Sequence, residues 1–266
     1  MSRITVSDLH KADGEHAPLG VVTSYDFTFA GLADEAGADI LLVGDSPAMV
    51  VQGEETTLPV TLDQMVYHTR LVARGRQRAL IVADLPFRAY KASPAQALDS
   101  SARLLAEGGA EMVKLEGGKA MIETVAFLAA RDIPVMGHLG LTPQSIHQLG
   151  GFRVQGRQPD RAAALVEEAL DLERAGARAL ILEAVPRELA RRVTESVGIP
   201  VIGIGAGPEC DGQVLVLHDI LGLFEGFQPR FAKRYLDGAG QVRGALEAFC
   251  RDVREGEFPA AEHTFE

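Results

Sequence analysis

The sequence has few of the residues from which disulfide scaffolds and thiolate metal sites are built. Its 266 residues include two cysteines, Cys210 and Cys250, which form neither a CxxC pair nor a cluster with histidines. A disulfide framework is therefore not expected, and a reducing compartment suits the composition better.

Positive charge and long apolar runs are also scarce. Lys and Arg number 26 against 37 Asp and Glu, which gives a formal net charge of -11. Nucleic acids and anionic membranes favour a basic surface, so neither is expected as a partner. No apolar run approaches the roughly 20 residues that span a bilayer. The polar start, MSRITVSDLHKADGEHAP, lacks a signal-peptide pattern, and we expect a cytoplasmic protein.

Apolar residues, in contrast, make up 47% of the chain and recur in short runs. These runs are rich in Val, Ile and Leu, and longer segments of helical pattern separate them. Near-continuous apolar strands indicate burial on both faces, as in a parallel sheet. The expected strands are 19–24, 39–44, 79–84, 111–116, 133–138, 178–183, 199–204 and 214–218.

The intervening segments carry helix signals. Segment 93–110 begins with Ser93 as a helix cap and Pro94 at the first helical position, and it ends in glycines. Eight such strand–helix units fit an α/β fold, the (β/α)8 TIM barrel of about 250 residues. A doubly wound open sheet is the alternative, although it usually has fewer strands. We expect one barrel domain over 1–266 with short polar extensions at both ends.

Polar side chains lie where the expected strands end. In a (β/α)8 barrel the active site forms at this end of the strands. A single acid there is more often a helix cap or a solvated loop residue, but the whole set predicts one functional rim. Its members are Ser24, Asp26, Asp45, Ser46, Asp84, Lys114, Glu116, His138, Glu183, His218 and Asp219. The glycine-rich stretch 139–160 is long enough to be a lid or binding loop.

Lys114 and Glu116 are two residues apart, so they face the same way in an extended strand. Opposite charges directed into a barrel are costly unless they are paired or bound to a ligand. A mutual ion pair between Lys114 and Glu116 is one alternative, and a substrate contact is the other.

Three acids of the rim suit a hard metal ion. Asp45, Asp84 and Glu116 offer oxygen ligands without thiolates, which favours Mg²⁺. Zinc would prefer histidine or cysteine, and only His138 and His218 are expected on the rim. The alternative is that these acids bind no metal.

A divalent ion at this rim would act as a Lewis acid. It would chelate a 2-oxo acid and make the neighbouring C–H bond more acidic, so that a general base could remove the proton. Glu183, at the end of an apolar strand, is the candidate base, although it could instead cap the helix that begins at Pro186. Lys114 would neutralise oxyanion charge or hold the substrate carboxylate, and Ser46 could donate a hydrogen bond.

These residues belong to longer motifs that resemble the 3-methyl-2-oxobutanoate hydroxymethyltransferase (ketopantoate hydroxymethyltransferase) family. The motifs are VTSYDFTFAGLADEAG, LLVGDS, VQGEETTLPVTLDQMVYHT, ADLPF, MVKLEGG, VMGHLGLTPQS, GGFRVQGR and VIGIGAGPECDGQVLVLHD. The resemblance implies a Mg²⁺-dependent TIM barrel of the phosphoenolpyruvate/pyruvate-like superfamily. It implies transfer of a hydroxymethyl group from 5,10-methylenetetrahydrofolate to 3-methyl-2-oxobutanoate, which gives 2-dehydropantoate in pantothenate biosynthesis. It also implies a homodecamer.

The resemblance further assigns a role to each matching position. On this basis the reaction would proceed through a Mg²⁺-chelated enolate that attacks the methylene carbon of the folate. The family more often has Leu-Gly where this chain has Pro47 and Ala48, so a stiffer loop is expected here. The implied metal ligands are Asp45, Asp84 and Glu116; the oxo-acid contacts are Asp45, Ser46, Asp84 and Lys114; the proton acceptor is Glu183.

Two other functions would use a similar barrel. A different Mg²⁺-dependent lyase or aldolase acting on a 2-oxo acid would share the acids but would not need folate. A non-catalytic barrel that binds a ligand or partner would not require the set of acids and the lysine together.

Overall fold

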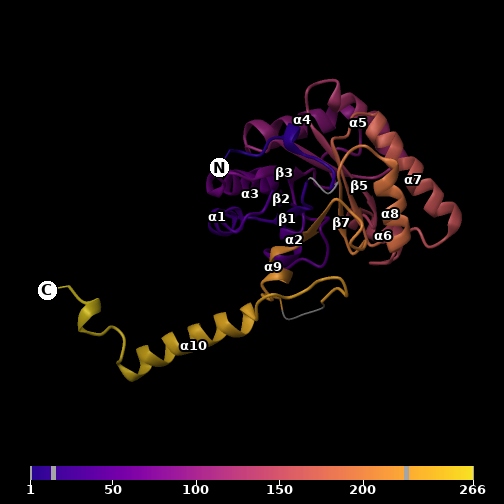
Figure 1. The fold of residues 1–266 in the computed structure, drawn as a ribbon. Coiled ribbons are helices and arrows are strands. Elements are labelled where there is room, and N and C mark those ends of the chain that lie inside the picture. Colours follow the sequence, from indigo (N-terminus) through magenta and orange to yellow (C-terminus); the bar gives the residue numbers. More distant parts are fainter. Residues whose placement is uncertain (1, 13–15, 225–227, 266) are drawn as a thin grey trace. The chain divides into compact units, whose positions relative to one another are not determined.

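A closed parallel barrel forms the core of the molecule (Figure 1). The computed structural model describes residues 2–12, 16–224 and 228–265, which fall into two compact units, Met1–Val216 and Leu217–Glu266. Among the described residues of the first unit, eight strands pair in sequence order and β8 closes on β1. This closure confirms the predicted barrel and excludes the open sheet. The strands are β1 Leu19–Thr23, β2 Ile40–Val43, β3 Leu80–Asp84, β4 Met112–Glu116, β5 Val135–Gly140, β6 Ala179–Glu183, β7 Val201–Ile204 and β8 Gly212–Leu215.

Helices connect the strands and surround the barrel. As predicted, Ser93 caps the helix that starts at Pro94, because its hydroxyl accepts the Gln96 N–H at 3.2 Å. The first unit contains α1 Phe27–Glu35, α2 Pro47–Val50, α3 Leu62–Gly75, α4 Pro94–Ala106, α5 Ile122–Ala129, α6 Ile146–Leu149, α7 Pro159–Arg174 and α8 Arg187–Ser196, with short 3-10 turns at Val6–Asp8, Lys119–Met121 and Pro143–Ser145. The second unit contains α9 Leu217–Ile220, α10 Gly238–Glu255 and a 3-10 turn at Ala261–His263.

Strands β2 to β7 bury both of their faces, in the alternation that a pleated strand imposes, whereas β1 and β8 each have one exposed position. In β3, Leu80 and Val82 join the apolar cluster inside the barrel, whereas Ile81 and Ala83 join the cluster under the helices. Asp84 is the next inward-facing position, so the interior changes from apolar to charged at the C-terminal end of the strand.

The N-terminal segment covers the opposite end of the barrel. Ile4, Val6 and Leu9 pack against the interior cluster, and the Ile4 N–H donates to the Arg78 carbonyl, just before β3, at 2.8 Å. Apolar packing thus fills the N-terminal end, and ionisable side chains collect at the other.

Two strand predictions need correction. The strand expected over 214–218 is β8, Gly212–Leu215, because Gly212 and Gln213 already pair with β7. The apolar run continues instead into α9, so His218 and Asp219 lie in a helix of the second unit and not at a strand end. The strand expected over 133–138 begins after Pro134, which has no N–H for the ladder, and extends to Gly140. No helix in the described ranges is long and apolar enough to cross a membrane.

We predict that Asp34→Ala destabilises the barrel by about 3 kcal/mol, because three backbone amides, one of them buried, lose their acceptor. Asp34, in α1, accepts the backbone N–H groups of Gln77, Arg78 and Ala79 at 2.6–3.1 Å just before β3. Urea unfolding measures the loss, and the exposed Asp99→Ala is the control.

The loss of stability in Asp34→Ala should depend on pH. Burial opposes ionisation, but the three amides outweigh it and lower the pKa of Asp34 from 3.8. The stabilisation is therefore present above the ordinary pKa and is lost as the pH falls through the lower folded-state pKa. A difference in stability from wild type that persists undiminished in acid would contradict this assignment.

Candidate active site

Charged side chains from neighbouring strands meet inside the C-terminal end of the barrel. Each occupies an inward-facing position at or near a strand end, which is how this fold builds its active sites. All but one are nearly inaccessible to solvent; the side chain of Glu183 is 13% exposed. The set consists of Asp45 after β2, Asp84 on β3, Lys114 and Glu116 on β4, His138 on β5 and Glu183 on β6. The structure thus brings together the predicted acids, the lysine and the histidine.

Lys114 balances the carboxylates. Its Nζ lies 2.9 Å from Asp84 Oδ2, and these two residues are register partners across β3 and β4. The ion pair is therefore with Asp84, not the pair with Glu116 that the two-residue spacing suggested. Burial disfavours the charge, but the carboxylates of Asp84, Glu116 and Asp45 outweigh it and raise the pKa of Lys114, which stays protonated.

His138 lies between two of the carboxylates. Its Nε2 is 3.3 Å from Glu183 Oε2, and its Nδ1 is 3.6 Å from Glu116 Oε1. Burial and the nearby Lys114 oppose protonation, yet the two carboxylates raise the pKa of His138 to about 9. The two carboxylates thus favour the protonated imidazole, whose Nε2 lies at ion-pair distance from Glu183 without a hydrogen-bond partner among the described residues.

The donor set fits a hard cation. Asp84 Oδ1 and Glu116 Oε1 are buried without a hydrogen-bond partner among the described residues. Burial and the carboxylates of Glu116 and Asp84 also raise the pKa of Asp45 to about 7, a repulsion that a cation would relieve. As the side chains stand, no group of three His, Cys, Asp or Glu in the described ranges is placed to hold a metal ion by itself. Mg²⁺ suits such a partial set, because it commonly uses one or two carboxylates and completes its shell with water and substrate oxygens.

Ser46 is held by a residue that the sequence analysis missed. The buried Tyr25 hydroxyl lies 2.7 Å from Ser46 Oγ and donates to Thr23 Oγ1 at 2.8 Å. Ser46 directly precedes α2, so Pro47 occupies the first helical position. The next residue, Ala48, is fully buried. The motif VTSYDF, which contains Tyr25, was the available signal.

Two further buried residues, Tyr90 and Gln144, were also missed. Tyr90 follows the ADLPF motif in ADLPFRAY, and Gln144 belongs to the GHLGLTPQS motif. Nothing in the neighbouring sequence distinguishes either residue from an ordinary loop residue. In the structure, Gln144 contacts Asp45 and Glu116, and the Tyr90 hydroxyl contacts Gln144 and the backbone of Glu116.

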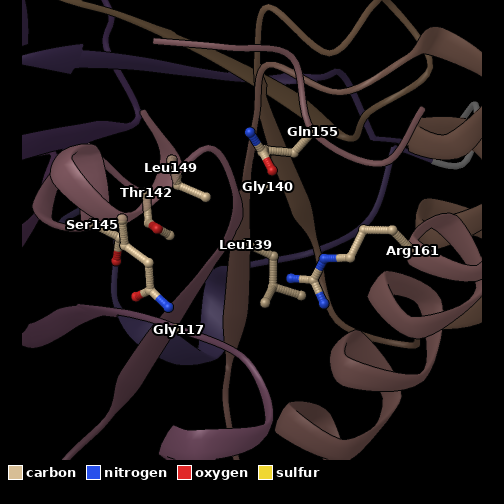
Figure 2. A pocket seen from close by; sticks show the side chains of 9 residues that line it. Gly117, Leu139, Gly140, Thr142, Ser145, Leu149, Gln155 and Arg161 are labelled. Atoms are coloured by element: carbon tan, nitrogen blue, oxygen red, sulfur yellow. The ribbon is translucent and has the colours of Figure 1, made fainter. Parts of the chain in front are cut away.

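A cavity of about 310 Å³ lies beside β5 (Figure 2). Figure 2 shows the side chains of Gln155 and Arg161 on one side of it and those of Thr142, Ser145 and Leu149 on the other. Its walls are Gly117, Leu139, Gly140, Thr142, Ser145, Gln148, Leu149, Gln155 and Arg161. The long segment expected as a lid or binding loop therefore lines a cavity. Gly140 is the register partner of Glu183, so this cavity adjoins the strand end that carries the candidate base.

The chain as a whole is similar to enzymes of one family. The family model described as ketopantoate hydroxymethyltransferase matches residues 3–261. A 3-methyl-2-oxobutanoate hydroxymethyltransferase from Magnetococcus marinus is 53% identical over 264 residues, covering 99% of this chain and 98% of the relative. Enzymes of the same name from Shewanella loihica and Thiobacillus denitrificans are 53% and 55% identical, and each match covers at least 98% of both chains.

Solved structures support the barrel assignment. Phosphonopyruvate hydrolase in complex with oxalate and Mg²⁺ superposes with a TM-score of 0.61 at 13% identity, covering 92% of this chain and 88% of that one. The 2,3-dimethylmalate lyase, described as a PEP mutase/isocitrate lyase superfamily member, gives 0.59 at 19% identity and covers 93% and 87%. At such identities the likeness establishes the fold.

We predict that Lys114 and Asp84 are energetically coupled. Lys114→Met should cost roughly 3–5 kcal/mol, because it leaves buried carboxylates without their counter-charge. Adding Asp84→Asn should then cost less than it does alone, which a double-mutant cycle of urea unfolding measures. The exposed Arg103–Asp63 pair, at the similar distance of 2.8 Å, is the control and should show far weaker coupling. Additive losses at Lys114 and Asp84 would contradict the role of this ion pair.

Proposed function

The chain belongs to the ketopantoate hydroxymethyltransferase family, and we propose how its barrel mouth carries out the reaction. The substrates proposed are 3-methyl-2-oxobutanoate and 5,10-methylenetetrahydrofolate, and the product is 2-dehydropantoate. The observation that supports this most is the position of Glu183, which is partly exposed and 3.3 Å from the charged His138 at the rim that carries Lys114 and the three carboxylates.

The carboxylate of the oxo acid binds beside Lys114, the lysine of the rim. Lys114 supplies the positive charge for an anionic substrate, and it is already held in place by Asp84. Ser46, fixed by Tyr25, offers a hydroxyl at the same strand ends. Asp45 and Asp84 complete the substrate contacts that the family motifs imply.

Asp45, Asp84 and Glu116 would hold Mg²⁺. When bound, the ion supplies Lewis acidity, which makes the C–H bond next to the oxo group more acidic. The unpartnered oxygens of Asp84 and Glu116 support this assignment. Phosphonopyruvate hydrolase, a barrel of the same fold, was solved with oxalate and Mg²⁺, which makes magnesium the first ion to test.

Glu183 accepts the C3 proton of the oxo acid. His138 Nε2 lies 3.3 Å from Glu183 Oε2, so the imidazole is the nearest positive charge to the proposed base. The C3 carbon then bonds to the methylene carbon of the folate, and the two bonds between that carbon and the folate nitrogens break. Water supplies the product hydroxyl, and its remaining proton and the proton accepted by Glu183 pass to the two nitrogens.

The proposal also covers the oligomeric state and the cellular compartment of the enzyme. We propose a homodecamer in the cytoplasm, as the family resemblance implies. Helix α10 supports assembly, because it exposes an apolar stripe with spacings of three and four residues. The stripe consists of Val242, Leu246, Phe249 and Val253, each at least 47% exposed.

We predict that Glu183→Gln abolishes exchange of the substrate's C3 proton with solvent while oxo-acid binding stays largely intact. The amide keeps the size of the carboxylate but cannot accept the proton. NMR in D2O follows the exchange, calorimetry gives the binding, and Glu188→Gln on the exposed face of α8 is the control. Undiminished exchange in Glu183→Gln would rule out this residue as the base.

We also predict that product formation requires 5,10-methylenetetrahydrofolate. Incubation of the wild-type enzyme with Mg²⁺ and 3-methyl-2-oxobutanoate should give 2-dehydropantoate only when the folate is present, as detected by mass spectrometry. Consumption of a 2-oxo acid substrate at the same rate without folate would instead indicate a lyase or aldolase.

A further inference from the structure

Gln144 is a buried polar residue that bridges two of the candidate metal-binding carboxylates. It lies in the 3-10 turn Pro143–Ser145 and is 3% exposed. Its Nε2 donates to Asp45 Oδ2 at 3.0 Å and to the Leu85 carbonyl at 2.9 Å. Its backbone N–H donates to Glu116 Oε2 at 2.9 Å. One residue therefore contacts a carboxylate that follows β2 and another at the end of β4.

The orientation of the Gln144 amide is fixed by its partners. The Tyr90 hydroxyl donates to Gln144 Oε1 at 2.7 Å and accepts the Glu116 N–H at 3.1 Å. A flipped amide would bring its oxygen against the Asp45 carboxylate and the Leu85 carbonyl, both of which are acceptors. The network thus allows one orientation, with the two N–H donors directed at Asp45 and Leu85.

Gln144 contacts one oxygen of the Glu116 carboxylate and one oxygen of the Asp45 carboxylate, and leaves the other oxygen of each. Gln144 engages Oε2 of Glu116, while Oε1 has no hydrogen-bond partner in the described part of the chain and lies 3.6 Å from His138 Nδ1. It engages only Oδ2 of Asp45. A neutral amide achieves this without adding charge to a site that already holds three carboxylates and one lysine.

We propose that Gln144 is a positioning residue for the metal site, which sets the orientation of Asp45 and Glu116 before an ion binds. This inference rests on the proposed function, because it takes those carboxylates as the Mg²⁺ ligands. Tyr90 acts one step further out by fixing the Gln144 amide. Partners of this kind orient metal ligands, and their loss typically costs about 10- to 100-fold in metal affinity.

The test is the Mg²⁺ affinity of the protein without oxo acid or folate, measured by calorimetry. Gln144→Met keeps the length of the side chain and removes both side-chain donors, and it should raise the Kd for Mg²⁺ by about 10- to 100-fold. Gln241→Met is the matched control, since Gln241 is exposed on α10 and lies outside the candidate site. It should leave the Kd unchanged.

A second variant tests whether Tyr90 affects the metal site through the side-chain amide of Gln144. Tyr90→Phe should weaken Mg²⁺ binding in the same direction, and it should add less in the Gln144→Met background than it does alone. Thermal unfolding without metal verifies that each variant folds. If Gln144→Met does not fold, Gln144→Asn carries the test, because its shorter amide cannot reach Asp45 and Leu85 from the same backbone position.

The outcomes separate this inference from the function on which it rests. An unchanged Kd in a folded Gln144→Met or Gln144→Asn protein overturns the role of Gln144 while the metal site stands. Absence of Mg²⁺ binding by the wild-type protein overturns the metal assignment and the inference together.

Discussion

The burial of three carboxylates at one end of the barrel is the constraint on which the site depends. Asp45, Asp84 and Glu116 are almost inaccessible to water, and like charges in such a place repel strongly. The ion pair between Lys114 and Asp84 offsets part of this repulsion, and the amide of Gln144 offsets another part. The unpartnered oxygens of Asp84 and Glu116 remain uncompensated, and they are the chemical reason why a cation would be favoured there.

The barrel makes this concentration of charge possible. Its interior is apolar along the strands, and the N-terminal segment packs against the same interior cluster. Among the described residues, the ionisable side chains of the site lie at or near the C-terminal ends of the strands. His138 connects the carboxylate of Glu116 to that of Glu183, so the acid that would hold a metal and the base that would remove a proton share one charged imidazole.

Much of this arrangement could be predicted from local sequence pattern. The spacing of Lys114 and Glu116 predicts a common face, and the alternation of apolar runs with helices predicts the barrel. The contacts of Gln144 could not be predicted in this way, because its partners Tyr90 and Asp45 are 54 and 99 residues away. The placement of His218 was wrong for a different reason: the apolar run after Gly212 crosses from a strand into a helix without a change in composition.

The central claim is that the carboxylates, Lys114 and Glu183 act on one substrate at the barrel mouth. A crystal structure with Mg²⁺ and 2-dehydropantoate bound tests it most directly. The arrangement predicts the ion in contact with oxygens of Asp45, Asp84 and Glu116, the product beside Lys114 and Ser46, and Glu183 facing C3 of the product. A product bound away from Lys114, or an ion held by other residues, would contradict it.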